Sequence, residues 1–261
     1  MKYFSLYLAF FRANLMKDMA YRGNFLLGSL TTALESLMVY FGVAVLFRHV
    51  TTIAQWTYEE MLILLGVYMI SNSAAWLLFR AGVSDLDRTI NRGDLDWYLV
   101  KPIDAQFLST VTRIDIEDAA RSLVGLVLVG LGLYRGTAEV SFWRLLAFVI
   151  TFLAGQAILY SIQLALKTVS FKSLQGWATN SIAFRFHDLA QYPTDIYRGL
   201  MRVVYTFVLP LAFIATVPAK ALIGEITAGL FALSLLIAAA ALAITRLIWK
   251  RALRTYTSAS S

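Results

Sequence analysis

Residues 80–121 read RAGVSDLDRTINRGDLDWYLVKPIDAQFLSTVTRIDIEDAAR, a long polar stretch in a chain that is otherwise strongly apolar. The stretch contains six Lys or Arg and eight Asp or Glu residues, and long apolar runs lie on both sides of it. A soluble loop of this length between two membrane helices is expected to receive a soluble partner. We therefore predict a cytoplasmic coupling loop at 80–122, held at a membrane surface by the rest of the chain.

Composition places the chain among all-α polytopic membrane proteins. Of its 261 residues, 59% are apolar and 15% are charged, whereas soluble domains have about 45–50% apolar and about 25% charged residues. The net charge of +7 fits the Lys/Arg excess that orients membrane proteins better than it fits nucleic-acid binding. With no cysteine and two histidines, no metal site is expected. No Ser/His/Asp set and no paired carboxylates stand out, so no catalytic residues are expected. Because the chain also has no GxxxxGK[ST] phosphate loop, it is predicted not to be an enzyme.

The N-terminal segment, residues 1–22, is predicted to form an amphipathic helix in the membrane interface. Its apolar residues recur at helical spacing and are Phe4, Leu8, Phe11, Leu15 and Met19. The alternative is a first spanning helix, which would bury Arg12, Lys17 and Asp18 in lipid.

Hydropathy predicts spans at 24–47, 61–79, 123–134, 142–166 and 228–249, with a fifth span within 173–219 and a basic tail at 250–261. Within 173–219, hydropathy alone favours 203–219, broken by Pro210 and ended by Pro218. Residues 57–60 have the pattern of a capping box, in which the Thr57 side chain bonds the backbone of Glu60 and Glu60 reaches back. This pattern predicts the start of the second membrane helix.

Lys and Arg are distributed unevenly between the two sides of this six-span topology. Alternate connecting segments contain 19 and 4 of the 23 basic residues. The positive-inside rule then places both termini and the large loop in the cytoplasm.

Polar side chains inside the predicted spans are candidates for a substrate path. Glu35 is the one acidic residue deep in a clear span, and an intramembrane carboxylate is by default a functional hypothesis. It could attract a cationic substrate or relay a proton, or it could be hydrogen-bonded between helices. The further candidates are Tyr40, Asn72, Trp76, Gln156, Tyr160 and Gln163. For each of them helix–helix packing is the alternative role.

Two segments carry a resemblance to a known family. They are NRGDLDWYLVKPID at 91–104 and QYPTDIYRGLMRVVYTFVLPLAFIATVPAKALIG at 191–224. Together they resemble permease subunits of bacterial ABC-2-type ABC exporters, in the branch of six-span proteins made separately from their ATPase. The resemblance implies a multi-pass protein of the bacterial inner membrane, two copies of an ATPase subunit, and a second permease chain that is identical or related.

The resemblance also implies a second arrangement of the fifth span. In that arrangement 173–191 crosses the membrane and 201–219 forms re-entrant helices, with Pro193, Pro210 and Pro218 as helix breaks. Arg185 and His187 depart from what such a span should contain, so both arrangements stay open.

ATP and magnesium are expected in the partner, because the chain has no GxxxxGK[ST] phosphate loop. We predict a short coupling helix across the cytoplasmic surface at 84–90, capped by Ser84, with a turn at Gly93 and a helix stop before Pro102. The predicted coupling residues are Asp85, Leu86, Arg88, Ile90, Arg92, Gly93, Asp94, Leu95, Asp96, Trp97, Tyr98 and Pro102. The alternative is that Trp97 and Tyr98 anchor the loop on the membrane surface.

The function expected from this sequence is ATP-driven export by a permease that forms half of a translocation path. The substrate class is a hydrophobic, amphipathic or cationic small molecule, or a lipid-linked product. One alternative is a secondary transporter or channel that uses an ion gradient and Glu35. Another is a membrane scaffold or sensor that recruits a soluble partner through the loop.

Overall fold

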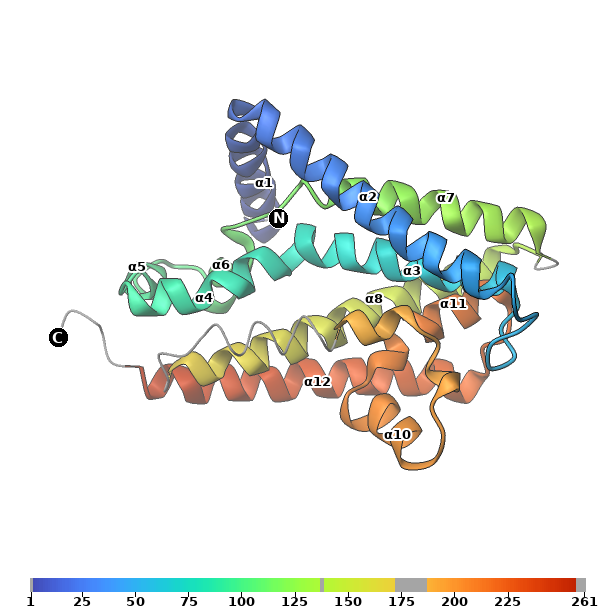
Figure 1. Ribbon diagram of the computed structural model, residues 1–261. Coiled ribbons are helices and arrows are strands. Elements are labelled where there is room, and N and C mark those ends of the chain that lie inside the picture. The colour runs from blue at the N-terminus through green and yellow to red at the C-terminus, as the bar shows by residue number, and fades with distance from the viewer. Residues whose placement is uncertain (1, 137–138, 172–186, 257–261) are drawn as a thin grey trace.

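The computed structural model describes residues 2–136, 139–171 and 187–256, and every regular element in these ranges is a helix (Figure 1). Within these ranges, four helices are long and apolar enough to cross a membrane. They are α2 (Arg22–Leu46), α3 with its continuation (Tyr58–Asn91), α8 (Phe142–Lys167) and α12 (Ala228–Arg254). A fifth apolar helix, α7 (Ala119–Arg135), has 17 residues. The expected all-helical fold is confirmed, whereas the count of six spans stays a prediction.

Helix α3 (Tyr58–Ala75) lies at the centre of the bundle. It begins at the predicted capping box, which is confirmed: Glu60 N–H donates to Thr57 Oγ1 at 3.3 Å, and Thr57 N–H donates to the Glu60 carboxylate at 2.9 Å. In its most apolar stretch 72% of the residues are buried, compared with 11% in α2 and 17% in α12. Helix α3 is therefore surrounded by protein, and the outer helices carry the surface available to lipid.

Glycines let α3 and α7 approach closely. A methyl group added to Gly66 of α3 would lie 2.5 Å from the carbonyl oxygen of Gly125, and one added to Gly125 would lie 2.7 Å from the carbonyl oxygen of Gly66. Small residues at helix crossings permit this approach of backbones in membrane proteins. By contrast, Gly130 on the same helix α7 has open space beside it.

The second membrane helix does not end at Phe79, so no break in the helix separates the predicted span from the predicted loop, whereas the point at which the span leaves the membrane stays a prediction. A π-helical turn, η1 (Trp76–Arg80), joins α3 to α4 (Ala81–Asn91) without a break. Ser84 therefore caps nothing, because its backbone is already inside a helix. The 34 residues from Tyr58 to Asn91 extend about 51 Å at 1.5 Å per residue. This exceeds the hydrocarbon thickness of about 30 Å, so the helix is longer than a membrane span requires.

Helices α5 (Leu95–Leu99) and α6 (Ala105–Val111) follow α4 at one end of the bundle, where α8 and α12 also end (left in Figure 1). We call this end the basic end, because it carries Arg88, Arg92, Lys101, Arg251 and Arg254. Helix α8 packs against α12 along the bundle and against α11 (Thr216–Ile223) near the opposite end.

The chain from Leu189 to Ile223 is a series of short pieces rather than one helix. These are η3 (Leu189–Gln191), η4 (Thr194–Ile196), α10 (Gly199–Val203), η5 (Val204–Val208), η6 (Leu211–Phe213) and α11. The helix is interrupted at Pro210, as expected, and no single helix covers 203–219. Pro218 lies in the first turn of α11, where a missing N–H is tolerated, so the prediction that it ends a helix is wrong. Pro193 precedes η4. Most of the alternative span, at 172–186, lies outside the described residues.

Helix α1 (Lys2–Ala20) stands at a steep angle to the long helices and meets α2 at Tyr21 (Figure 1). It has no buried residue. Polar side chains hold it against the bundle, because Tyr7 Oη donates to the Leu77 carbonyl at 3.1 Å and Asn14 Nδ2 donates to the Thr112 carbonyl at 3.2 Å. Its location in the membrane interface stays a prediction.

The glycine contact gives a direct test of the fold. We expect Gly125→Ala to lower the melting midpoint of the detergent-purified protein by several degrees, because the added methyl group would meet the Gly66 backbone, and overpacking costs about 1–3 kcal/mol. The matched control is Gly130→Ala on the same helix, which should leave the midpoint unchanged or raise it through better helix propensity. Equal effects of the two substitutions would contradict the α3–α7 contact.

Candidate functional site

The tip of the basic end is built by a tight turn between α4 and α5. Gly93 has a φ of +76°, in the left-handed region that favours glycine, and its N–H donates to the Ile90 carbonyl at 3.1 Å. Pro102 lies in the connection between α5 and α6 and is exposed. The turn expected at Gly93 is therefore present, although it follows a long helix rather than a short one.

Three of the predicted docking anchors are buried and cannot contact a partner in this conformation. Leu86, Ile90 and Leu95 are 0%, 7% and 0% exposed and belong to the main core. They are buried because α4 packs against α6 and α8 instead of lying across the surface. The prediction that these three residues anchor a partner is therefore wrong. They stabilise the fold of the tip.

The exposed apolar side chains at the tip form what we call the tip patch: Trp97, Leu99 and Val100. Trp97 is 70% exposed and Val100 is 76% exposed. Tyr98, beside the patch, is half-buried, and its Oη donates to Thr112 Oγ1 at 3.4 Å. This hydrogen bond fixes α5, so the patch is presented by an ordered turn of helix.

Charged side chains around the tip differ in their ion pairs and in their exposure. Asp85 accepts ion pairs from Arg88 and Arg113, each at 3.2 Å, and Asp87 pairs with Lys167 at the end of α8. The pair between Asp87 and Lys167 ties α4 to α8. Arg92 and Asp94 are exposed next to the tip patch, whereas Asp96 is half-buried.

Arg80 is the most deeply buried charge in the structure's described part, at 2% exposure. Its guanidinium donates to Asn72 Oδ1 at 2.5 Å and lies 5.5 Å from the centre of the Trp76 ring. With the Gln163 amide turned so that its oxygen faces the guanidinium, Gln163 accepts from Nε at 3.0 Å and from a terminal nitrogen at 2.8 Å. Three residues predicted to line a substrate path, Asn72, Trp76 and Gln163, therefore surround Arg80. The sequence predicts Arg80 in the polar loop, but it lies in the bundle.

The other candidates are dispersed and contact the protein itself. Gln156 Nε2 donates to Ser71 Oγ at 2.7 Å, so it joins α8 to α3. Tyr160 Oη accepts from Gln106 Nε2 at 2.9 Å. The hydroxyls of Tyr40 and Tyr58 are 3.4 Å apart. These contacts favour helix–helix packing as the role of Gln156 and Tyr40, and the candidates do not gather into one site.

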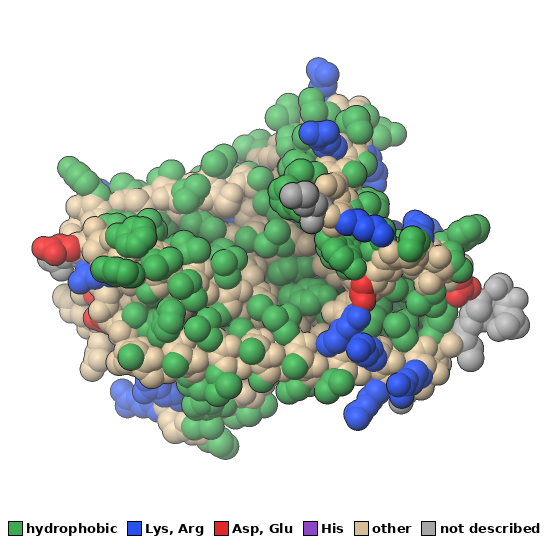
Figure 2. All heavy atoms as spheres, turned by 180° about the vertical axis from the view of Figure 1, so that it is seen from behind, with side chains coloured by type: hydrophobic (Ala, Val, Ile, Leu, Met, Phe, Trp, Pro, Cys, Tyr) green, Lys and Arg blue, Asp and Glu red, His purple; other side chains and the backbone are tan. Residues whose placement is uncertain are grey.

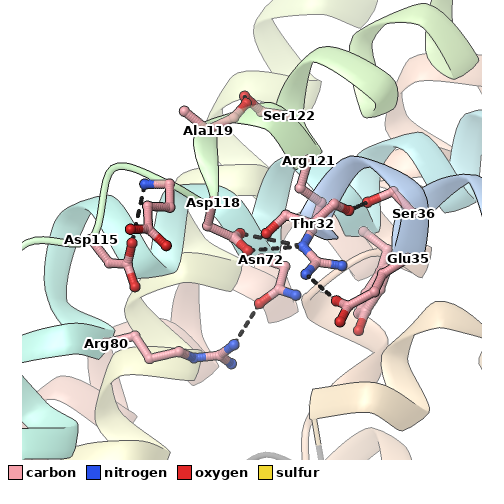
Figure 3. A network of polar contacts seen from close by, with 12 residues as sticks. Thr32, Glu35, Ser36, Asn72, Arg80, Asp115, Asp118, Ala119, Arg121 and Ser122 are labelled. Atoms are coloured by element: carbon pink, nitrogen blue, oxygen red, sulfur yellow. Dashed lines mark hydrogen bonds and ion pairs between the residues drawn. The ribbon is translucent and has the colours of Figure 1, made fainter. Parts of the chain in front are cut away.

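Glu35 lies on the outer side of α2, with 61% of its side chain exposed. It pairs with Arg121 at 3.4 Å, and Arg121 in turn bonds Asp118 at 3.1 Å in the turn that begins α7 (Figure 3). Arg121 and Asp118 are 15% and 10% exposed. The sequence did not identify this pair, because its members are 86 residues apart and Arg121 was assigned to the loop.

The end of the bundle opposite the basic end is held by Asp195. Its carboxylate accepts from Trp56 Nε1 at 3.0 Å and pairs with Lys220 at 2.7 Å and Arg202 at 3.1 Å. Burial acts to raise the pKa of Asp195, but the hydrogen bonds from Lys220 and Trp56 and the charges of Lys220 and Arg202 together outweigh it, and the pKa lies below its ordinary value. The broken segment is thereby tied to the loop before α3 and to α11.

Comparison with known proteins gives a match to a protein family. The model of a family described as "ABC-2 family transporter protein" matches residues 33–260. No curated protein and no solved structure matches the chain. In the ranges that the structure describes, no group of three or more His, Asp or Glu side chains could hold a metal ion.

The Arg80 site makes a prediction about stability. Asn72→Leu removes the acceptor at 2.5 Å and leaves part of a buried charge unpaired, so we expect a loss of about 1–3 kcal/mol. Thermal unfolding in detergent measures this loss. In Arg80→Met, where the charge is gone, the same Asn72→Leu change should cost far less. Additive effects of the two changes would contradict the coupling.

Proposed function

Because this chain belongs to the ABC-2 family of transporter proteins, we propose that it is the membrane-spanning permease subunit of an ATP-driven exporter. A separate ATPase, in two copies, supplies ATP hydrolysis with bound magnesium, since the chain has no phosphate loop of its own. The chain itself forms half of the translocation path and binds the ATPase at the basic end.

The observation that carries this proposal is the tip patch. Trp97 and Val100 are 70% and 76% exposed on the turn that follows a helix about 51 Å long. About 16 Å of that helix belongs to α4, at 1.5 Å per residue, so the tip stands away from lipid. Exposed aromatic and aliphatic side chains in water mark protein interfaces, and tryptophan is a typical hot spot.

The continuous helix gives the proposed docking site a mechanical connection to the membrane. Force applied at α5 passes to α4 through the turn at Gly93, and from α4 to α3 through η1. Helix α3 is surrounded by its neighbours, so it cannot move without moving α7 and α8, which pack against it. On this proposal, closure of the two ATPase copies pulls the tips together and switches the path toward the outside.

The same proposal assigns the membrane orientation. The basic end is cytoplasmic, in the inner membrane of a bacterium, because basic residues are retained on that side. Six crossings are assigned to α2, α3, α7, α8, a segment within 173–219 and α12. Both termini are then cytoplasmic.

Helix α2 supplies the surface for the second permease, which is identical or related. Asn24, Thr31, Glu35 and Gly42 recur at helical spacing along one exposed side of this helix. A carboxylate that faces hydrocarbon is costly even when paired, so protein or water covers this side in the membrane. We assign it to the second permease and the path between the two chains. There Glu35 favours an amphipathic or cationic substrate, or a lipid-linked product.

Docking at the tip patch is testable with one substitution. We expect Trp97→Ala to weaken binding of the ATPase at least tenfold, because truncating a central aromatic residue of an interface costs about 2 kcal/mol or more. Pull-down of the ATPase from solubilised membranes measures the binding. Membrane insertion should be unchanged, since Trp97 is exposed.

The matched control is Trp143→Ala, which removes a tryptophan that is 74% exposed at the opposite end of the bundle. It should leave ATPase binding as in the wild type. A complex that tolerates Trp97→Ala as well as Trp143→Ala would place the coupling site elsewhere.

The second permease can be located by photo-crosslinking. A photoreactive amino acid at position 31 should give a product with the mass of two permease chains, because Thr31 lies on the side of Glu35. The same amino acid at position 26 is the control, since Leu26 is 65% exposed on the purely apolar side of α2. Crosslinks from position 26 but not from position 31 would refute the assignment.

A further inference from the structure

A groove opens on the side of the bundle near the basic end. Its walls come from α1, from the junction of α3 and η1, and from α6, α8 and α12, and its volume is about 970 Å³. Figure 2 shows it as a hollow below the start of the chain, with apolar side chains inside and charged ones at its edge. We call it the lateral groove. The volume lies at the upper end of the range of ligand pockets, about 300–1,000 Å³.

One part of the lateral groove is aromatic and apolar. Tyr3 and Phe107 meet edge to face with ring centres 4.9 Å apart, and Phe79 packs against Tyr160 at 5.4 Å. Leu242 of α12 completes this wall. The hydrogen bonds that hold α1 to the bundle keep the wall in place, so the groove is preformed.

The other part of the groove is charged. Arg246 of α12 donates to Asp104 Oδ1 at 3.1 Å and to Gln106 Oε1 at 2.6 Å. The side chains of Arg246 and Asp104 remain 40% and 31% exposed, so both can contact a ligand. Burial acts to raise the pKa of Asp104, but the hydrogen bonds from Arg246 and from the backbone N–H groups of Phe107 and Gln106, together with the charge of Arg246, outweigh it, and the pKa lies below its ordinary value. This end of the groove therefore offers one guanidinium and one carboxylate.

The apolar part and the charged part of the lateral groove follow one another along α12. Helix α12 runs toward its end at Arg254 in the basic end, so Arg246 lies about 6 Å closer to that end than Leu242, one turn earlier. The charged part thus faces the membrane surface and the apolar part faces the middle of the bilayer. A lipid of the adjacent leaflet has the same order of head group and acyl chain.

We propose that the lateral groove binds one phospholipid-like molecule from the leaflet at the basic end, with an acyl chain against the aromatic wall and a zwitterionic head group at Asp104 and Arg246. The phosphate of such a head group contacts the guanidinium, and its ammonium group contacts the carboxylate. Charge complementarity selects this class, because the phosphate of a purely anionic head group would compete for Arg246 and supply no cation to pair with the Asp104 carboxylate.

Binding here is connected to the tip. Asp104 caps the N-terminus of α6, accepting from the Phe107 N–H at 3.2 Å, and α6 follows α5 after a short connection. A bound head group therefore contacts the element that positions the tip patch. That the bound molecule is a transported substrate rests on the proposed function, whereas the binding itself does not.

The test measures lipid retained by the purified chain. The wild-type protein in mild detergent is incubated with phosphatidylethanolamine or phosphatidylglycerol, and bound lipid is counted by native mass spectrometry. We expect about one phosphatidylethanolamine per chain and at least tenfold less phosphatidylglycerol. Leu242→Trp, which fills the groove, should reduce retention at least tenfold. Leu247→Trp, on the exposed side of the same helix, should not.

Two outcomes would overturn the proposal: equal retention of both lipids by the wild type, or equal retention by the Leu242→Trp and Leu247→Trp variants. If Leu242→Trp fails to fold, the double variant Asp104→Asn with Arg246→Gln takes its place, and it should lose the preference for phosphatidylethanolamine. The pull-down of the ATPase from solubilised membranes separates this site from the proposed function. If Leu242→Trp abolishes lipid binding but no ATPase is recovered in the pull-down, the site is supported and the export role is refuted.

Discussion

Hydrocarbon offers no hydrogen-bond partner, and this constraint decides how the polar groups of the bundle are arranged. Arg80 is 2% exposed, and a cation so placed is stable only when it is fully bonded. Asn72, Trp76 and Gln163 surround it. The cluster joins α3, η1 and α8 at the point where the central helix continues into α4.

The same constraint separates structural polar groups from candidate functional ones. Gln156 and the Arg80 cluster are enclosed by protein and join neighbouring helices. Glu35 and the charged end of the lateral groove are bonded within the chain but remain open to the outside. The tip patch is apolar and exposed. Each of these three surfaces leaves groups that another molecule can contact. In the proposed assembly, the Glu35 side of α2 contacts a second permease, the lateral groove binds a lipid, and the tip patch binds the ATPase.

Local sequence signals predicted the local features well. The capping box at Thr57, the turn at Gly93 and the break at Pro210 each depend on a few adjacent residues, and each is present. The predicted start of the coupling helix at Ser84 is wrong, because it too was based on a few adjacent residues. Ser84, followed by Asp85 and Asp87, has the pattern of a helix N-terminus, but the helix already extends through it from α3.

Features that depend on distant parts of the chain could not be read from the sequence. The burial of Leu86, Ile90 and Leu95 follows from the packing of α4 on α6 and α8, which no local pattern encodes. Similarly, Glu35 meets Arg121 across 86 residues, and Gln163 meets Arg80 from another helix. An intramembrane carboxylate marks a position of interest, but its partner is known only once the helices are placed.

The most direct test of the central claim is purification of the wild-type chain from its native membrane in mild detergent, with identification of the co-purifying chains and an ATPase assay. We expect a soluble chain with a phosphate loop in near one-to-one ratio to the permease. Chemical crosslinks should join it to the segment around Trp97, and the complex should hydrolyse ATP. If no ATPase co-purifies, even after crosslinking, the account of a permease driven through its tip is contradicted.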